Sequence, residues 1–104
     1  MSYVAYIMVG TTGIKVGQTN NIKRRLRELK YENVEVKAII KTDSRTIAEI
    51  IEAVLRNYYI NDMGGTRVGN DWIANIEYNT SFMEDPKLKA ILKMYDIKEI
   101  IIRL

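Results

Sequence analysis

Basic side chains are concentrated in one short stretch of this chain. Between Lys15 and Lys37 lie seven Lys and Arg residues and three Glu residues, a local excess of four positive charges, whereas the whole chain carries only +3. Clustered cations of this kind are typical of a surface that binds phosphate groups, and equally typical of a solvated helix face. The stretch indicates an anionic partner such as a nucleic acid, with the solvated face as the alternative.

The residue types that the chain lacks narrow the possible reactions. Its 104 residues include no histidine and no cysteine. This composition excludes Ser-His triads, imidazole general bases, thiol nucleophiles and zinc sites built from His or Cys. Any catalysis must therefore come from Tyr, Lys, Arg, Asp and Glu.

One arginine is placed at the edge of a buried helix face. The helix expected after residue 21 has an apolar stripe of Ile22, Leu26 and Leu29, and Arg25 lies beside that stripe. Its guanidinium would there be held rather than mobile, and could face a phosphate. The alternative is an ordinary arginine whose aliphatic stem covers the core.

Two glutamates on the second expected helix have different explanations. The segment from Thr46 to Glu49 matches a capping box, in which the Glu side chain reaches back to the amide of the cap residue. Glu52 has no capping role. An ion pair with Arg56, four residues later, is the explanation that spacing alone favours.

The elements that must position these side chains follow from the apolar patterns. The unbroken apolar run 3–9 predicts a central strand, and a turn at 10–13 joins it to a second strand over 14–17. Alternation over 34–41 predicts a third strand. The order strand, strand, helix, strand, helix predicts a compact α+β fold: a ββαβα core with a small three-stranded antiparallel sheet flanked by helices. Tyr3 and Tyr6, an odd number of residues apart, must face opposite sides of this sheet.

The last third of the chain predicts a helix and a tail. Asp85 followed by Pro86 is a helix-start signal, and residues 97–104 fit either a strand or a further helical turn. We expect one domain over 1–104, with the core at 3–75 and the C-terminal helix and tail at 83–104. No apolar run reaches the roughly 18 residues of a membrane helix. The first residues lack a basic signal-peptide stretch, so a cytoplasmic location is expected, in a host cell if the protein is viral.

Several short segments, in order, resemble the GIY-YIG nuclease domain, in the phage-type branch whose second signature reads K-I-G. They are Val4-Ala5-Tyr6, then Lys15-Val16-Gly17 followed by the run to Leu26 that contains Arg25, then Glu52 with Ala53-Val54-Leu55-Arg56, and finally Arg67-Val68 with Asp71-Trp72-Ile73. Four residues depart from the family pattern. Val4-Ala5 replace the first Gly-Ile, Lys15 replaces a Tyr, and Arg56 stands where the branch often has a His.

The resemblance implies a metal-dependent endonuclease that hydrolyses DNA phosphodiester bonds with Mg²⁺ or Mn²⁺. Glu52 would bind the metal, Arg25 would contact the non-bridging phosphate oxygens, and Tyr6 would orient or deprotonate the attacking water. We expect the two helices to bring Arg25 and Glu52 together over one side of the three-stranded sheet. A phenol is a poor base at neutral pH, so we expect Lys15, across the hairpin, to favour its deprotonated form. Further contacts to the nucleic acid are expected from Lys23, Arg24, Arg27 and Asn70.

Two other functions use the same fold. A chain with a degenerate site could bind nucleic acid or a protein without cutting it, and function has to be argued from sites rather than folds. A third possibility is an oligomerising protein, with a homodimer formed through the apolar tail, whose residues are Ile100, Ile101, Ile102 and Leu104.

Overall fold

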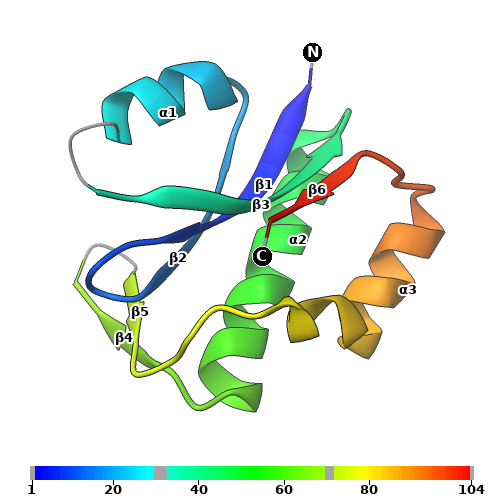
Figure 1. Ribbon diagram of the computed structural model, residues 1–104. Coiled ribbons are helices and arrows are strands. Elements are labelled where there is room, and N and C mark those ends of the chain that lie inside the picture. The colour runs from blue at the N-terminus through cyan, green and yellow to red at the C-terminus, as the bar shows by residue number, and fades with distance from the viewer. Residues whose placement is uncertain (1, 30–32, 70–71, 104) are drawn as a thin grey trace.

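An antiparallel sheet organises the chain (Figure 1). The computed structural model describes residues 2–29, 33–69 and 72–103. Within them the sheet has six strands in the order β4-β5-β2-β1-β3-β6, and every neighbouring pair is antiparallel. The strands are β1 (Tyr3–Val9), β2 (Ile14–Thr19), β3 (Glu35–Thr42), β4 (Thr66–Val68), β5 (Trp72–Ala74) and β6 (Ile100–Ile102). The predicted three-stranded sheet was an undercount, because three strands of only three residues each extend the predicted β1, β2 and β3.

Strand β1 lies in the middle of the sheet and is covered on both faces. It pairs with β2 on one side and β3 on the other, and all residues from Val4 to Met8 are buried. A strand buried on both faces needs apolar side chains in both directions, which explains an unbroken apolar run in place of alternation. The prediction of a central strand is confirmed.

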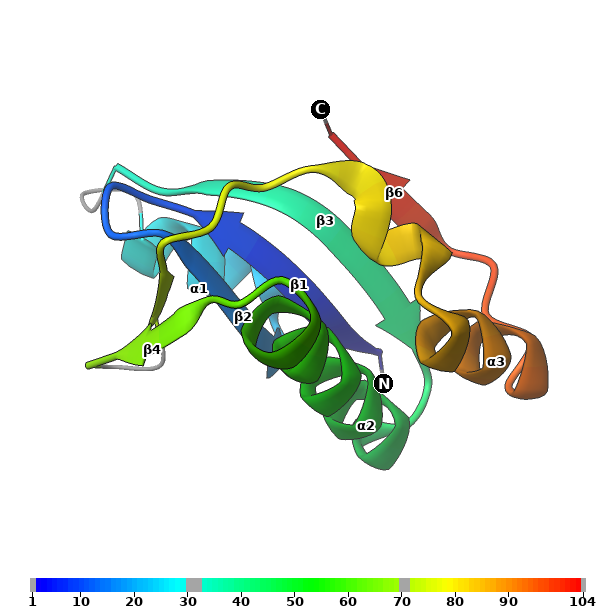
Figure 2. The same cartoon turned by 90° about the horizontal axis from the view of Figure 1, so that it is seen from below.

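Helices lie against both faces of the sheet (Figure 2). The helix α2 (Arg45–Asn57) contributes Ile51 and Leu55 to a core that includes Ala5 and Ile7. The helix α1 (Ile22–Leu29) contributes Leu29 to a smaller cluster with Tyr6 and Met8 on the other face. Since side chains alternate along a strand, we call these surfaces the α2 face and the α1 face.

The helix α1 is only loosely attached to its face. Of the predicted stripe, Leu29 is buried and Ile22 half-buried, whereas Leu26 is 43% exposed. Asn21 begins the helix, because its side-chain oxygen accepts a hydrogen bond from the Arg24 amide. With eight residues, α1 spans about two turns, so it can turn few side chains toward the sheet.

The start of α2 differs from the prediction. Ser44, in extended conformation, is the N-cap, and its hydroxyl accepts a hydrogen bond from the Ile47 amide. Thr46 therefore lies inside the helix, and Glu49 forms an ion pair with Arg45 at 3.1 Å. The expected capping box was wrong because a better cap residue stands two positions earlier.

The chain after α2 continues through short helical turns. A π-helical segment η1 (Tyr58–Asp62) extends α2, and a 3₁₀ turn η2 (Thr80–Glu84) precedes the helix α3 (Pro86–Met94). The buried Asp85 side chain caps α3 by accepting from the Leu88 amide at 3.1 Å, which confirms the helix-start signal.

The tail forms a strand rather than a helical turn. Residues of β6 pair with Ala38, Ile39 and Ile40 of β3. Ile100 and Ile102 pack against the core, while Ile101 is 57% exposed. Leu104 lies outside the described residues. No helix within the described ranges is long and apolar enough to span a membrane.

A close approach between β1 and β2 fixes the position of Tyr6. Tyr6 stands opposite Gly17, and a Cβ atom built on Gly17 would lie 2.4 Å from the Tyr6 hydroxyl oxygen. The ring, 4% exposed, therefore extends from β1 across the backbone of β2. Only glycine at position 17 leaves room for the phenol there.

We predict that Gly17→Ala destabilises the fold by about 1 to 3 kcal/mol, because the added methyl group overpacks a site that has no free volume. Urea denaturation measures this change. Gly69→Ala is the matched control, since a Cβ atom at Gly69 meets no atom within 4 Å. Equal stabilities of the two variants would contradict the close approach of Tyr6 to Gly17.

Candidate functional site

The Tyr6 hydroxyl and the Arg25 guanidinium are in contact on the α1 face. Arg25 donates a hydrogen bond from Nε to the Tyr6 hydroxyl at 3.4 Å and from Nη1 to Glu28 at 3.1 Å. The hydrogen bond to Tyr6 is the main reason that the pKa of Arg25 is raised. The Arg25 side chain is 29% exposed, so one face of a held guanidinium remains open to solvent. The Tyr6 hydroxyl on β1 and the Arg25 guanidinium on α1, which the sequence places on separate elements, are therefore in contact.

Lys15 lies on the same face but has a different neighbour from the one predicted. It stands two residues before Gly17 on β2, and therefore on the same face. Its Nζ atom lies 5.8 Å from the centre of the Trp72 ring. The register places Lys15 opposite Met8 of β1 and Trp72 of β5. The cation in hydrogen-bond contact with the Tyr6 hydroxyl is Arg25, and the assistance of Tyr6 by Lys15 stays a prediction.

Glu52 belongs to α2 and approaches β2 from the opposite face. Arg56 donates from Nη2 to Glu52 Oε1 at 2.9 Å and to the Val16 carbonyl of β2 at 3.1 Å. Both side chains are mostly buried, with 24% of Arg56 and 21% of Glu52 exposed. The ion pair expected from spacing is present, and Arg56 additionally fastens it to the sheet.

The Tyr6–Arg25 pair and the Glu52–Arg56 pair contact neighbouring residues of the same strand, β2. Val16, which accepts from Arg56, directly precedes Gly17, over which the Tyr6 ring lies. Among the described residues, β2 pairs with β5 only at Ile14 and Lys15, so this contact follows the end of that pairing. Arg25 and Glu52 therefore flank the same stretch of β2 from its two faces. The expectation that they meet over one side of the sheet was wrong, because α1 and α2 pack on opposite faces.

The remaining basic residues of α1 lie on its outer side. Lys23, Arg24 and Arg27 are exposed, and Arg24 forms an ion pair with Glu28 at 3.6 Å. Exposed cations on a short helix suit contacts to a phosphate backbone without base recognition. Asn70, the fourth predicted contact, lies outside the described residues.

A metal would depend on Glu52 alone. In the part of the chain that the structure describes, no three Asp, Glu, His or Cys side chains gather into a group able to hold a metal ion. Magnesium is commonly bound through one or two carboxylates and keeps several waters. A single, partly exposed carboxylate fits such an ion, although one of its oxygens already accepts from Arg56.

Arg56 is the site residue that the sequence did not identify as functional. Spacing four residues after Glu52 gives the ion pair, but no sequence pattern gives the bond to the Val16 carbonyl, because that bond depends on how α2 lies against β2. Its Nε atom is buried without a hydrogen-bond partner among the described residues.

A comparison with protein families finds a match over most of the chain. The family model of the T5orf172 domain matches residues 3–95, a span that contains Tyr6, Lys15, Arg25 and Glu52 and extends beyond the predicted core to α3. This domain type is phage-associated and related to nuclease-type domains. No curated protein and no solved structure matches the chain significantly. Since the match covers most of the sequence, the chain belongs to the T5orf172 domain family.

Proposed function

We propose that the protein is a metal-dependent endonuclease of the GIY-YIG type that hydrolyses DNA phosphodiester bonds. The observation that carries the proposal is that two side-chain pairs contact consecutive residues of β2. The Tyr6 ring lies over Gly17 and its hydroxyl accepts from Arg25, while Arg56 joins Glu52 to Val16. Membership of the T5orf172 family supports nuclease-like or nucleic-acid-binding function at a coarser level.

The reacting phosphate would bind at the edge of β2 after Lys15, where the pairing with β5 ends, with Arg25 on one side of the strand and Glu52 on the other. Arg25 keeps its guanidinium in place through Tyr6 and Glu28, and a held fork of donors matches the non-bridging oxygens of a phosphodiester. Such preorganised donors stabilise the charge that develops in the transition state. The Tyr6 hydroxyl, fixed by Gly17 and Arg25, would orient the attacking water or accept its proton.

Glu52 would hold Mg²⁺ or Mn²⁺ through one carboxylate. When bound, the metal supplies a Lewis acid for the phosphate oxygens. Arg56 acts as a positioning residue, because its two hydrogen bonds set where the Glu52 carboxylate stands beside β2. Lys15 and the outer cations of α1 would contribute positive charge to strand binding.

A second function is favoured by the same ion pair. Arg56 supplies to Glu52 the positive charge that a metal would otherwise supply. A chain in which this pair stays closed would bind nucleic acid at Arg25 and α1 without cutting it. Cleavage and binding measured on the same variants separate the two functions.

We predict that Glu52→Gln abolishes metal-dependent nicking of plasmid DNA, because the amide loses the charge that holds a divalent cation. Arg25→Ala should slow nicking by about 100-fold or more, the usual cost of removing a preorganised donor. The assay measures nicking rates with Mg²⁺ or Mn²⁺.

Glu84→Gln is the matched control for Glu52→Gln. It removes an exposed, ion-paired carboxylate that lies in η2, away from β2. Nicking that survives in Glu52→Gln would contradict the nuclease proposal. Binding of DNA by the wild-type protein without any nicking would establish the second function instead.

We predict that Arg56→Ala lowers the free energy of unfolding by about 1 to 3 kcal/mol, because Glu52 and the Val16 carbonyl lose their donor in a mostly buried place. Arg45→Ala removes the exposed partner of Glu49 on the same helix and should cost less than about 1 kcal/mol. Urea denaturation of both variants tests this. A loss no larger for Arg56→Ala than for Arg45→Ala would show that the bridge to β2 contributes nothing.

A further inference from the structure

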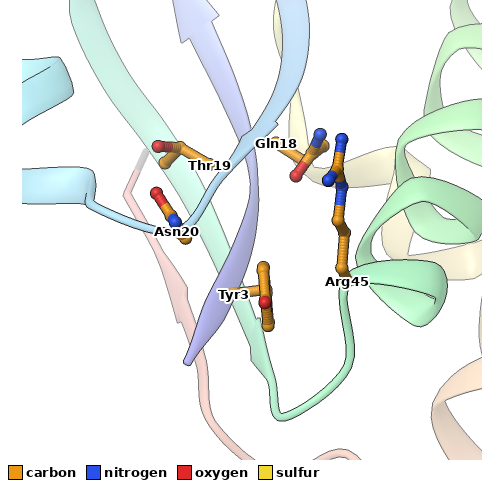
Figure 3. Close-up of a pocket in the computed structure, with 5 residues that line it drawn as sticks. All are labelled: Tyr3, Gln18, Thr19, Asn20 and Arg45. Atoms are coloured by element: carbon orange, nitrogen blue, oxygen red, sulfur yellow. The ribbon is translucent and has the colours of Figure 1, made fainter. Parts of the chain in front are cut away.

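A polar pocket lies at the end of β2 beside the start of α2. Its volume is about 320 Å³, and it is lined by Tyr3, Gln18, Thr19, Asn20 and Arg45. Figure 3 shows the Arg45 side chain extending from α2 toward Gln18, with Tyr3 on the neighbouring strand. Three segments distant in the sequence therefore line the same space, with one guanidinium, two side-chain amides and two hydroxyl groups among their residues.

The chemistry of the lining favours an anion. Among the described residues that line the pocket, Arg45 is the only charged one. Its side chain is 70% exposed, its Nε atom donates to Glu49 at 3.1 Å, and its terminal nitrogens extend toward Gln18. A guanidinium fork with a neighbouring amide is a suitable donor set for phosphate oxygens.

The pocket continues the candidate site along the same two elements. Gln18 stands two residues after Val16 on the α2 face of β2, and Val16 is the residue to which Arg56 is bonded. Arg45 and Glu52 are seven residues apart on one stripe of α2, which corresponds to about 10 Å along the helix. A strand bound beside β2 at Glu52 would therefore pass the pocket.

We propose that this pocket is a second phosphate-binding site for a bound nucleic-acid strand. It takes the backbone phosphate next to the reacting phosphate, and the reacting phosphate lies between Arg25 and Glu52. Arg45 supplies the charge, and the Gln18 amide supplies an uncharged donor. The inference rests on the nucleic-acid binding part of the proposed function, but not on cleavage. In this role, the end of β2 holds the nucleic-acid strand so that the target bond lies beside the reacting groups.

The test measures DNA binding by fluorescence anisotropy, in EDTA and over a series of salt concentrations. Arg45→Ala should weaken binding to all sequences alike and lower the slope of log affinity against log salt by about one. Gln18→Ala should weaken binding and leave this slope unchanged, because it removes no charge. Lys89→Ala is the matched control, since Lys89 is an exposed, ion-paired cation on α3, away from the pocket.

Each outcome decides the proposal. The expected loss in Arg45→Ala supports the site even if the wild-type protein never cuts DNA, so failure of the nuclease proposal remains distinguishable. Equal affinity and slope for wild type, Arg45→Ala and Lys89→Ala would overturn it. A second result would also overturn it: inorganic phosphate competes for the pocket through Arg45 at constant ionic strength, but Arg45→Ala leaves the affinity for DNA unchanged.

Discussion

The strand β2 carries both halves of the candidate site, and the Tyr6 ring packs across its Gly17. This contact places a phenol from the central strand over β2, where Arg25 of α1 donates a hydrogen bond to it. On the opposite face, α2 is fastened to the same strand through Arg56 and the Val16 carbonyl. The strand β2 thus acts as a common support, and in the proposed function residues far apart in the sequence contact one strand of nucleic acid beside it.

The same arrangement explains why the site carries so little free charge. Arg25 is paired with Glu28 and Glu52 with Arg56, so each reactive group is held by a partner of opposite sign on its own helix. Held groups lose less side-chain entropy when a ligand binds, and this favours preorganised electrostatic recognition. The cost is that a metal must share Glu52 with Arg56, which is the feature that separates a cutting from a binding protein.

Most of the core could be predicted from the sequence because its signals are local. The run of apolar residues in β1 and the Asp85-Pro86 helix start both determined their elements. Strand alternation predicted that Tyr3 and Tyr6 face opposite sides of the sheet, and helix periodicity placed Arg25 beside the apolar stripe, whereas the role of Tyr6 came from the family resemblance. The strands β4 and β5 were missed, and β6 was left open between a strand and a helical turn, because strands of three residues show too little periodicity. The side of the sheet that Glu52 approaches, and the pocket beside Arg45, depend on how α2 packs, which periodicity does not encode.

The most direct test of the central claim is a crystal structure of the protein with Mn²⁺ and a short DNA carrying a non-hydrolysable phosphate analogue at the target bond. The account predicts anomalous scattering from Mn²⁺ beside the Glu52 carboxylate, with the analogue in contact with Arg25 and the Tyr6 hydroxyl at the level of Gly17. Manganese bound elsewhere, or a strand that lies away from β2 while the Glu52–Arg56 pair stays closed, would contradict it.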